Sequence, residues 1–202
     1  FYIQGSFYKK RFNELEKNTY NHKIRVISSN INLDRFYSNV DPVSVIEDLI
    51  KISNPTAKEK IIFVWPEGIL PAISQEELIE YHWLFNDHFN ENHLLVIGIN
   101  SQSVNNNSKD YFNSFSVYDN ELNLLNSYNK INLVPFGEFL PFENMLRSIG
   151  LRSITNKYQS YSSGNKREII ELKQNNFSVK ILPLICYEII YTGKLFHKSD
   201  FD

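Results

Sequence analysis

Three short stretches of the sequence each place a potentially reactive side chain at the end of an apolar segment. They are FVWPEG with Glu67, YNKINLVPFGEFLPFE with Lys130 and Glu138, and LICYE with Cys186 and Glu188. A sheet holds the side chains at its strand ends in place, while the adjoining loops leave room for a substrate. These residue types at these positions predict a site for nucleophilic chemistry.

Cys186 is the candidate nucleophile. Cysteine attacks as its thiolate, and an unperturbed thiol has a pKa of about 8.5. A carboxylate such as Glu67 can take the thiol proton, and an ammonium such as Lys130 favours the anion and then donates to an oxyanion. Glu, Lys and Cys are therefore sufficient for acyl transfer, and the five histidines fall in no telling motif.

Each of these residues also has an ordinary structural interpretation. Taken alone, a cysteine in an apolar strand is more often a small core side chain. Glu67 could mark the start of a helix, and a lysine such as Lys130 is most often a solvated surface residue. Glu138 in an aromatic setting is less ordinary, because burying an unpaired charge is costly. The joint occurrence of Glu, Lys, Glu and Cys in this order favours the catalytic interpretation.

Composition limits the class of protein. The chain has 202 residues with 42% hydrophobic and 22% charged content, which suits one globular domain with a sizeable core. The net charge of −2 gives no electrostatic argument for a nucleic-acid partner. A single cysteine excludes an intrachain disulfide framework and a cysteine-cluster metal site. No apolar run reaches the roughly 20 residues that span a bilayer.

The first half of the chain predicts alternating strands and helices. Strands are expected at 23–31, 60–67 and 93–100. A helix is expected to begin after the Asp41-Pro42 pair, and a second helix from the Ser74–Glu77 capping box to about residue 91.

The second half predicts hairpins. Residues 111–119 and 124–130 read as an antiparallel pair after a polar loop at 101–110, and 167–173 with 177–186 as a second hairpin. A short helix is expected at 142–150. This order of elements predicts a mixed sheet in a layered α/β fold.

These motifs resemble those of the nitrilase, or carbon–nitrogen hydrolase, superfamily, whose base, lysine and nucleophile occur in the order Glu, Lys, Cys. More narrowly, WPEG, NKINLVPFGEFLPFE and ICYE are similar to the motifs of the bacterial apolipoprotein N-acyltransferase family. The resemblance runs from about Lys23 to the end and implies an α-β-β-α sandwich. We therefore expect an N-terminal arm at 1–22, which could be membrane-proximal or soluble, and a partial hydrolase-like domain at 23–202.

The resemblance also implies roles for individual residues. Cys186 would be the nucleophile, Glu67 the general base and Lys130 the oxyanion donor. Glu138 would orient the lysine or the incoming amine, while Glu188 would support the site and Tyr187 would line an acyl channel. Four apolar side chains near the lysine, which could instead simply pack the domain, would form a lipid-contacting loop: Phe136, Phe139, Leu140 and Phe142.

The implied reaction moves an acyl chain from a phospholipid to the amine of a diacylglyceryl-cysteine on an apolipoprotein. It implies a membrane surface, a place on the bacterial inner membrane facing the periplasm, and no metal or organic cofactor. One alternative is a soluble amidase of the nitrilase type that hydrolyses a small amide. The other is an inactive relic.

The sequence departs from the family pattern in three ways. SSN follows the first strand where the family has Gln-Pro-Asn, no membrane helices precede the domain, and the chain ends soon after Cys186. The first residue is Phe1 rather than Met. We therefore expect a fragment that lacks the C-terminal strands of the sandwich, so that apolar sheet surface is exposed.

Overall fold

A computed structural model describes most of the central part of the chain. The described residues are 5–6, 21–28, 41–70, 73–105, 108–142, 145, 148, 160–174 and 176–190. The arm predicted at 1–22 and the helix predicted at 142–150 therefore lie almost wholly outside them.

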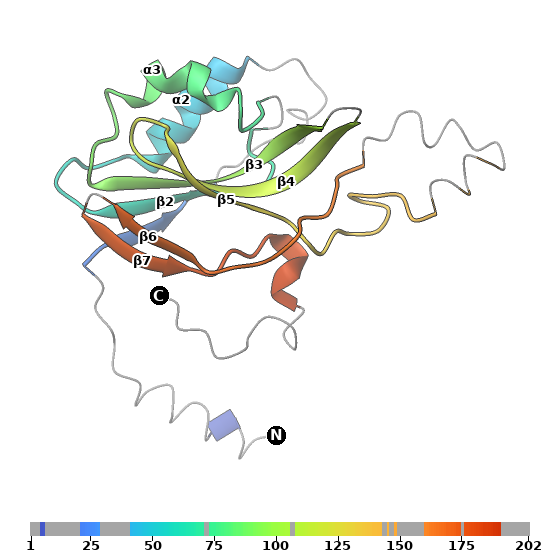
Figure 1. Cartoon of the computed structure of the whole chain (residues 1–202). Coiled ribbons are helices and arrows are strands. Elements are labelled where there is room, and N and C mark those ends of the chain that lie inside the picture. The colour runs from blue at the N-terminus through green and yellow to red at the C-terminus, as the bar shows by residue number, and fades with distance from the viewer. Residues whose placement is uncertain are drawn as a thin grey trace.

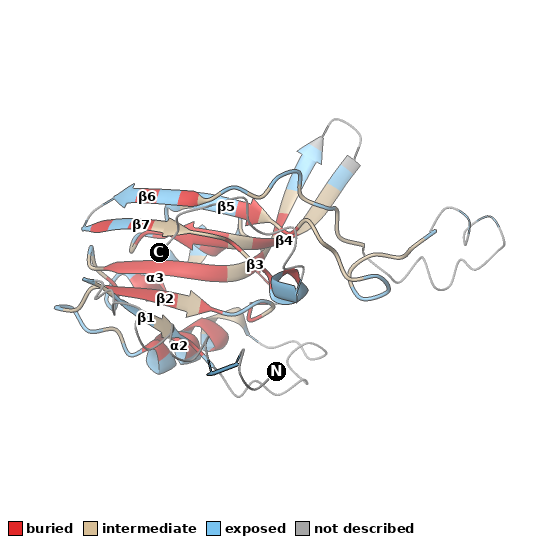
Figure 2. Ribbon diagram, turned by 90° about the horizontal axis from the view of Figure 1, so that it is seen from below, coloured by how far each residue is buried: buried red, intermediate tan, exposed pale blue. Residues whose placement is uncertain are grey.

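A five-stranded mixed sheet forms the centre of the fold (Figure 1). Its strands, in spatial order, are β1 (Lys23–Val26), β2 (Ile61–Trp65), β3 (His93–Asn105), β4 (Ser108–Tyr118) and β5 (Leu124–Asn129). The pairs β1–β2 and β2–β3 are parallel, whereas β3–β4 and β4–β5 are antiparallel. The parallel strands β2 and β3 are the most buried part of the sheet, as Figure 2 shows.

Helices cover one face of this sheet. Helix α2 (Pro42–Ser53) begins where the side chain of Asp41 accepts from two backbone N–H groups, and proline fits its first turn. Helix α3 (His82–Phe85) lies beside it and follows the 3₁₀ helix η2 (Leu78–Tyr81). The core between helices and sheet is rich in large side chains and includes Ile46, Leu49, Phe63, Trp65, Phe85, Leu95 and Ile97.

A second, two-stranded sheet packs on the other face. It consists of β6 (Ile170–Gln174) and β7 (Phe177–Ile181), which pair as an antiparallel hairpin. Buried residues alternate with others along each strand, and these buried side chains contact the far face of the large sheet. This second core comprises Ile170, Leu172, Phe177 and Val179 together with Ile62, Leu94, Val96 and Val117.

The predicted α/β fold is therefore confirmed, with a helical layer, a mixed sheet and a second sheet stacked in that order.

Part of the second face is left open. Ile24 and Val26 of β1 pair with Ile62 and Val64 and point to the same side, yet they are 65% and 67% exposed. In the part of the chain that the structure describes, no helix has the length and apolar character needed to cross a bilayer.

The long helix predicted from Ser74 to about residue 91 is wrong. The segment forms only η2 and α3, two short pieces of four residues each. Its start is tied to the sheet, because the N–H of Gln75 donates to the carbonyl of Asn100 at 2.7 Å. Asn86 and Asp87 then favour a turn, since their side chains compete with the helical backbone for hydrogen bonds.

Two strand predictions also need correction. The polar segment 101–110 does not form the expected loop. Strands β3 and β4 continue through it as a long hairpin, and residues 106–107 lie outside the described residues. The strand expected to reach residue 186 ends at Ile181 instead. Pro183, which has no N–H to donate to a neighbouring strand, lies just beyond it. Cys186 consequently lies in the 3₁₀ helix η3 (Cys186–Ile190) rather than in a strand.

Buried His93 predicts a loss of stability in acid. The backbone N–H of Asn90 donates to Nδ1, and Nε2 lies 3.2 Å from the carbonyl of Thr56, so the neutral ring fits the site. Burial lowers the pKa of His93 below its ordinary value of 6.5. The unfolded chain therefore binds a proton more readily, and His93 stabilises the fold fully above about pH 6.5 and progressively less below it.

Urea unfolding between pH 5 and 8 checks this prediction. The His93→Gln variant keeps a polar side chain that does not titrate, so its stability should fall less steeply as the pH is lowered. At pH 8 we expect it to be less stable by about 1–2 kcal/mol, because its hydrogen bonds are imperfectly replaced. Equal pH slopes for the two proteins would contradict the assignment.

Candidate active site

Glu67 lies directly after β2, in a turn that the sheet positions. Pro66 ends the strand, and Gly68 has a φ of 70°, which glycine adopts without strain. Trp65 pairs with Ile97, so the chain passes over Gly98 of β3 as it leaves the sheet. A Cβ atom on Gly98 would lie 2.6 Å from the Cα of Glu67. Only glycine at this position lets the turn approach the sheet so closely.

Lys130 follows β5 and is almost completely buried, with 1% of its side chain exposed. Its Nζ donates to Oε1 of Glu138 at 2.9 Å and lies 3.4 Å from Oε1 of Glu67. A buried ammonium is tolerable when carboxylates compensate its charge. The structure thus brings Glu67, Lys130 and Glu138 into one group, as the sequence analysis expects.

Asn113 of β4 ties this group together. Its Nδ2 donates to Oε1 of Glu67 and, at 2.8 Å, to Oε1 of Glu138. Its carbonyl accepts from the backbone N–H of Lys130 at 2.9 Å. Asn113 could not be identified from the sequence, because an asparagine in a polar strand belongs to no recognisable motif. The only available signal was its place in a strand that neighbours the one ending at Lys130.

The electrostatics of the group favour a charged lysine. Burial by itself would lower the pKa of Lys130, but the hydrogen bond from Lys130 to Glu138 and the negative charges of Glu67 and Glu138 raise it on balance. The ammonium form therefore persists beyond neutral pH.

Cys186 lies in a strained and accessible turn. It is exposed, and its φ of 51° is in the left-handed region, which costs a non-glycine residue roughly 1–2 kcal/mol. Two hydrogen bonds close the turn around it: the N–H of Glu188 donates to the carbonyl of Ile185, and the N–H of Ile185 donates to Oε2 of Glu188. Strain held in this way is common at reactive residues.

Glu188, expected to support the site, is completely buried. Its Oε1 accepts from the hydroxyl of Tyr128, from the backbone N–H groups of Ile131 and Asn132, and from Arg167. Burial would raise the pKa of Glu188, but these hydrogen bonds and the charge of Arg167 lower it on balance. Its carboxylate joins the turn that bears Cys186 to the loop that follows Lys130.

The loop after Lys130 orients Glu138 and exposes apolar side chains. The N–H of Val134 donates to Oε2 of Glu138 at 2.8 Å, and the N–H of Phe136 donates to the carbonyl of Phe139. Phe136 and Phe142 have φ values of 63° and 58° and are 72% and 79% exposed. Phe139 and Leu140 are partly buried. Of the four side chains predicted to contact lipid, two are thus freely exposed and two pack partly against the domain.

Tyr187 and its neighbours extend this apolar surface on η3. Tyr187, Ile189 and Ile190 are 54%, 62% and 60% exposed. The loop after β5 and η3 lie at the same end of the molecule in Figure 1, in keeping with the contacts between Glu188 and residues 131–132. The nucleophile candidate therefore opens a short helix that exposes three large apolar side chains.

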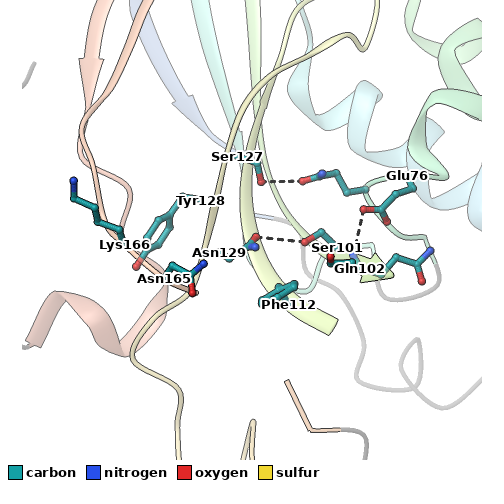
Figure 3. A pocket seen from close by; sticks show the side chains of 11 residues that line it. Glu76, Ser101, Gln102, Phe112, Ser127, Tyr128, Asn129, Asn165 and Lys166 are labelled. Atoms are coloured by element: carbon teal, nitrogen blue, oxygen red, sulfur yellow. Dashed lines mark hydrogen bonds between the residues drawn. The ribbon is translucent and has the colours of Figure 1, made fainter. Parts of the chain in front are cut away.

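A polar cavity of about 410 Å³ lies beside the group, at the β5 edge of the sheet (Figure 3). Its lining includes Ser101, Ser127 and Asn129, and Oδ1 of Asn129 accepts from the hydroxyl of Ser114 at 2.7 Å. None of Glu67, Lys130 and Cys186 lines it. Asn129 ends β5 directly before Lys130, so the same strand end forms part of the cavity wall and carries the lysine. Within the described ranges, no group of three or more His, Cys, Asp and Glu side chains is placed to hold a metal ion.

Comparison with known proteins decides the family. Residues 47–196 match the family model described as carbon-nitrogen hydrolase, which is most of the chain. The chain belongs to the carbon–nitrogen hydrolase family. This confirms the resemblance that the motifs around Glu67, Lys130 and Cys186 indicated.

Relatives within the carbon–nitrogen hydrolase family carry a narrower name. The apolipoprotein N-acyltransferase of Brucella suis biovar 1 is 26% identical over 180 residues, covering 85% of this chain and 33% of that protein. That of Rhizobium leguminosarum bv. trifolii is 29% identical, covering 78% of this chain and 30% of that protein. The chain thus spans about a third of the length of these curated relatives.

Solved structures of carbon–nitrogen hydrolases are more distant. A cysteine-to-alanine mutant of the Nesterenkonia AN1 amidase, from the nitrilase superfamily, has a TM-score of 0.44 and 14% identity, covering 79% of this chain and 54% of that one. A CN-hydrolase superfamily protein from Xanthomonas campestris has a TM-score of 0.43 and 16% identity, with 75% and 50% coverage.

Substituting Gly98 should displace the candidate base of this carbon–nitrogen hydrolase domain. In Gly98→Ala the new Cβ would lie 2.7 Å from the backbone N of Glu67, so the turn must move. We expect Cys186 acylation to slow by about 100-fold, since such shifts of a catalytic group are that costly. The free energy of unfolding should fall by only about 1–3 kcal/mol.

Gly137→Ala is the matched control. Its Cβ would lie 3.4 Å from a Val134 methyl carbon, which is ordinary contact, so acylation should change little. Acylation kinetics and urea unfolding of both variants provide the measurement. Equal acylation rates for the two variants would show that Gly98 does not position Glu67.

Proposed function

We propose that this chain carries the catalytic domain, at 23–202, of an N-acyltransferase that modifies apolipoproteins. The enzyme would take a fatty acyl chain from a phospholipid, hold it as a thioester on Cys186, and pass it to the amine of an N-terminal diacylglyceryl-cysteine. One observation carries the proposal: a buried Lys130 is fixed between Glu67 and Glu138, and the carboxylate of Glu188 joins the loop that follows Lys130 to the exposed turn of Cys186. The names of the relatives from Brucella suis and Rhizobium leguminosarum support the choice of substrates.

In the first half-reaction, Glu67 takes the proton of the Cys186 thiol and the sulfur attacks the ester carbonyl carbon. A tetrahedral intermediate forms, and the ammonium of Lys130 donates to its oxyanion. The C–O bond of the ester then breaks, and the alkoxide leaving group receives the proton from Glu67. The products are a thioester on Cys186 and a lysophospholipid.

In the second half-reaction, the acceptor amine attacks the thioester carbonyl. Glu67 takes a proton from the amine, Lys130 again stabilises the oxyanion, and the C–S bond breaks as the amide forms. The thiolate recovers a proton from Glu67, so the enzyme returns to its starting state. Both half-reactions therefore use the same base and the same oxyanion donor in a ping-pong order.

Glu67 suits the role of base better than Glu138 does. Glu138 is 12% exposed and accepts from Lys130, Asn113 and the N–H of Val134, so both of its oxygens are engaged. Glu67 is 35% exposed, and within the described residues its hydrogen bonds reach only Oε1. The second oxygen of Glu67 is thus available to a thiol proton, while Glu138 orients Lys130.

The surroundings of Cys186 suit a lipid donor. Large apolar side chains are normally buried, and an exposed cluster of them marks a surface that contacts an apolar partner. Tyr187, which directly follows the candidate nucleophile, and Phe136 and Phe142, on the loop after Lys130, are all more than half exposed. We propose that these side chains contact acyl chains at a membrane surface, with Tyr187 beside the bound chain and the domain on the periplasmic side of an inner membrane.

Mass spectrometry of the chain after incubation with phospholipid vesicles tests the proposal. A fatty-acyl adduct is expected on Cys186, the only cysteine of the chain, and it should be absent in Cys186→Ser. Adding a diacylglyceryl-cysteine peptide should discharge the adduct and acylate the peptide amine. Discharge to free fatty acid with no peptide product would favour an amidase-like hydrolase. A folded chain with no adduct would favour an inactive relic.

A further inference from the structure

Arg167 belongs to a buried ionic cluster that has no part in the reaction scheme. Its Nη2 lies 2.5 Å from Oε1 of Glu188, and its side chain is only 11% exposed. Its guanidinium carbon lies 5.5 Å from the centre of the Tyr128 ring, in the range of a cation–π contact. Neither the motifs nor the order of strands pointed to Arg167, which belongs to the segment just before β6.

The carboxylate of Glu188 is the centre of this cluster. Burial raises the pKa of Tyr128, and the neighbouring carboxylate raises it further. The tyrosine therefore stays protonated, and its hydroxyl donates a hydrogen bond to Oε1 of Glu188 at 2.7 Å. Among the described residues, Arg167 is the one cation in salt-bridge contact with Glu188. A buried carboxylate without such a cation would carry an uncompensated charge.

The same carboxylate connects the two catalytic segments. Oε2 accepts from the N–H of Ile185, on one side of Cys186, while the N–H of Glu188 itself closes the turn on the other side. Oε1 accepts from the N–H groups of Ile131 and Asn132, at 3.1 and 3.2 Å, immediately after Lys130. One side chain therefore links the segment that carries the nucleophile to the segment that follows the lysine.

We propose that Arg167 is a positioning residue for the nucleophile, acting through Glu188 to hold the Cys186 turn against the loop that follows Lys130. The proposal rests on the proposed function insofar as Cys186 is the reacting group. Arg167 contacts neither substrate nor sulfur in this arrangement. Its guanidinium fixes the carboxylate, and the carboxylate fixes the two loops.

Thiol alkylation measures this role without requiring turnover. Cys186 is the only thiol, so the rate of its reaction with iodoacetamide between pH 6 and 10 reports its ionisation and access directly. In Arg167→Met the charge of Glu188, two residues from the sulfur, is uncompensated and opposes a thiolate. The midpoint of the pH profile should rise by about one pH unit, which slows alkylation at pH 7 roughly tenfold.

Two comparisons separate positioning from general stabilisation. Lys166→Met removes the neighbouring cation, which is 76% exposed and pairs with Glu168, and should leave the profile unchanged. On a Glu188→Gln background, Arg167→Met should shift the midpoint by less than about 0.3 unit, because no carboxylate remains to be compensated. If Arg167→Met does not fold, Arg167→Lys on the two backgrounds takes its place, with a smaller shift that again depends on Glu188.

The outcomes are distinct from those of the acylation experiment. Equal midpoints for wild type and Arg167→Met, or the same shift with and without Glu188, would overturn the role of Arg167 even in an active enzyme. A shift that depends on Glu188 in a chain that forms no acyl adduct would uphold that role and count against the proposed function.

Discussion

Replacing Glu67 with Gln is expected to slow acylation of Cys186 by at least about 1,000-fold at neutral pH, within the range of general-base effects. Glutamine keeps the shape of the side chain and an oxygen that can accept from Asn113. It cannot accept the thiol proton, so the thiolate would form only by exchange with solvent. Acyl-adduct formation from phospholipid vesicles, followed by mass spectrometry, provides the rate.

Alkaline pH should separate loss of the base from loss of the site. Solvent hydroxide forms the thiolate above about pH 9, so alkylation of Cys186 by iodoacetamide should recover there in Glu67→Gln. Acyl transfer should recover only partly, because the leaving group also needs a proton from Glu67.

Glu76→Gln is the matched control for charge. Glu76 accepts from the backbone N–H of Gln102 at 3.2 Å, and among the described residues it makes no ion pair with Lys130. We expect its acylation rate to equal that of the wild type. A wild-type rate in Glu67→Gln would instead assign the base role elsewhere, with Glu138 the next carboxylate to test.

The part of the site that the sequence predicts consists of residues that end strands. Glu67 and Lys130 follow β2 and β5, and their apolar strands and turn residues place them at the sheet without further information. The contacts of Glu138 with Lys130 agree with the expectation that it orients the lysine. The roles of these residues in catalysis stay predictions until the variants are measured.

The rest depends on contacts between distant segments. Asn113 and Arg167 act on carboxylates 46 and 21 residues away in the chain, and their own neighbours in the sequence carry no signal of it. The turn at Cys186 could not be predicted for a different reason. The run ILPLIC has the composition of a buried strand, but Pro183 lies in it, and the buried Glu188 draws the following residues into η3.

The long helix expected from Ser74 does not form, because hydrogen bonds to the sheet outweigh the helical pattern of the local sequence. Glu77 does accept from the N–H of Ser74, as a capping box predicts. However, Ser74 also bridges to Asn100 of β3, which holds this end of the segment in an extended form. The polar hairpin of β3 and β4 shows the opposite case. Its sequence is typical of a loop, but pairing between the two strands holds it in an extended form.

Lys130→Met should both slow acylation strongly and destabilise the fold. The variant removes the oxyanion donor, which we expect to slow acylation by about 100–1,000-fold. It also leaves the carboxylates of Glu67 and Glu138 side by side with no cation between them, at a cost of about 3–5 kcal/mol in the free energy of unfolding. Urea unfolding and acyl-adduct kinetics measure the two effects separately, and Lys173→Met, at an exposed position on β6, is the control.

A double variant distinguishes these two roles of Lys130. In Lys130→Met with Glu138→Gln the buried cation and its most buried carboxylate partner are removed together, so much of the lost stability should return. Acylation should not return, because neither methionine nor glutamine supplies a cation at the oxyanion. A double variant that regains acylation along with stability would show that Lys130 only holds the structure together, and the ammonium would then have to be replaced by another donor in the reaction scheme.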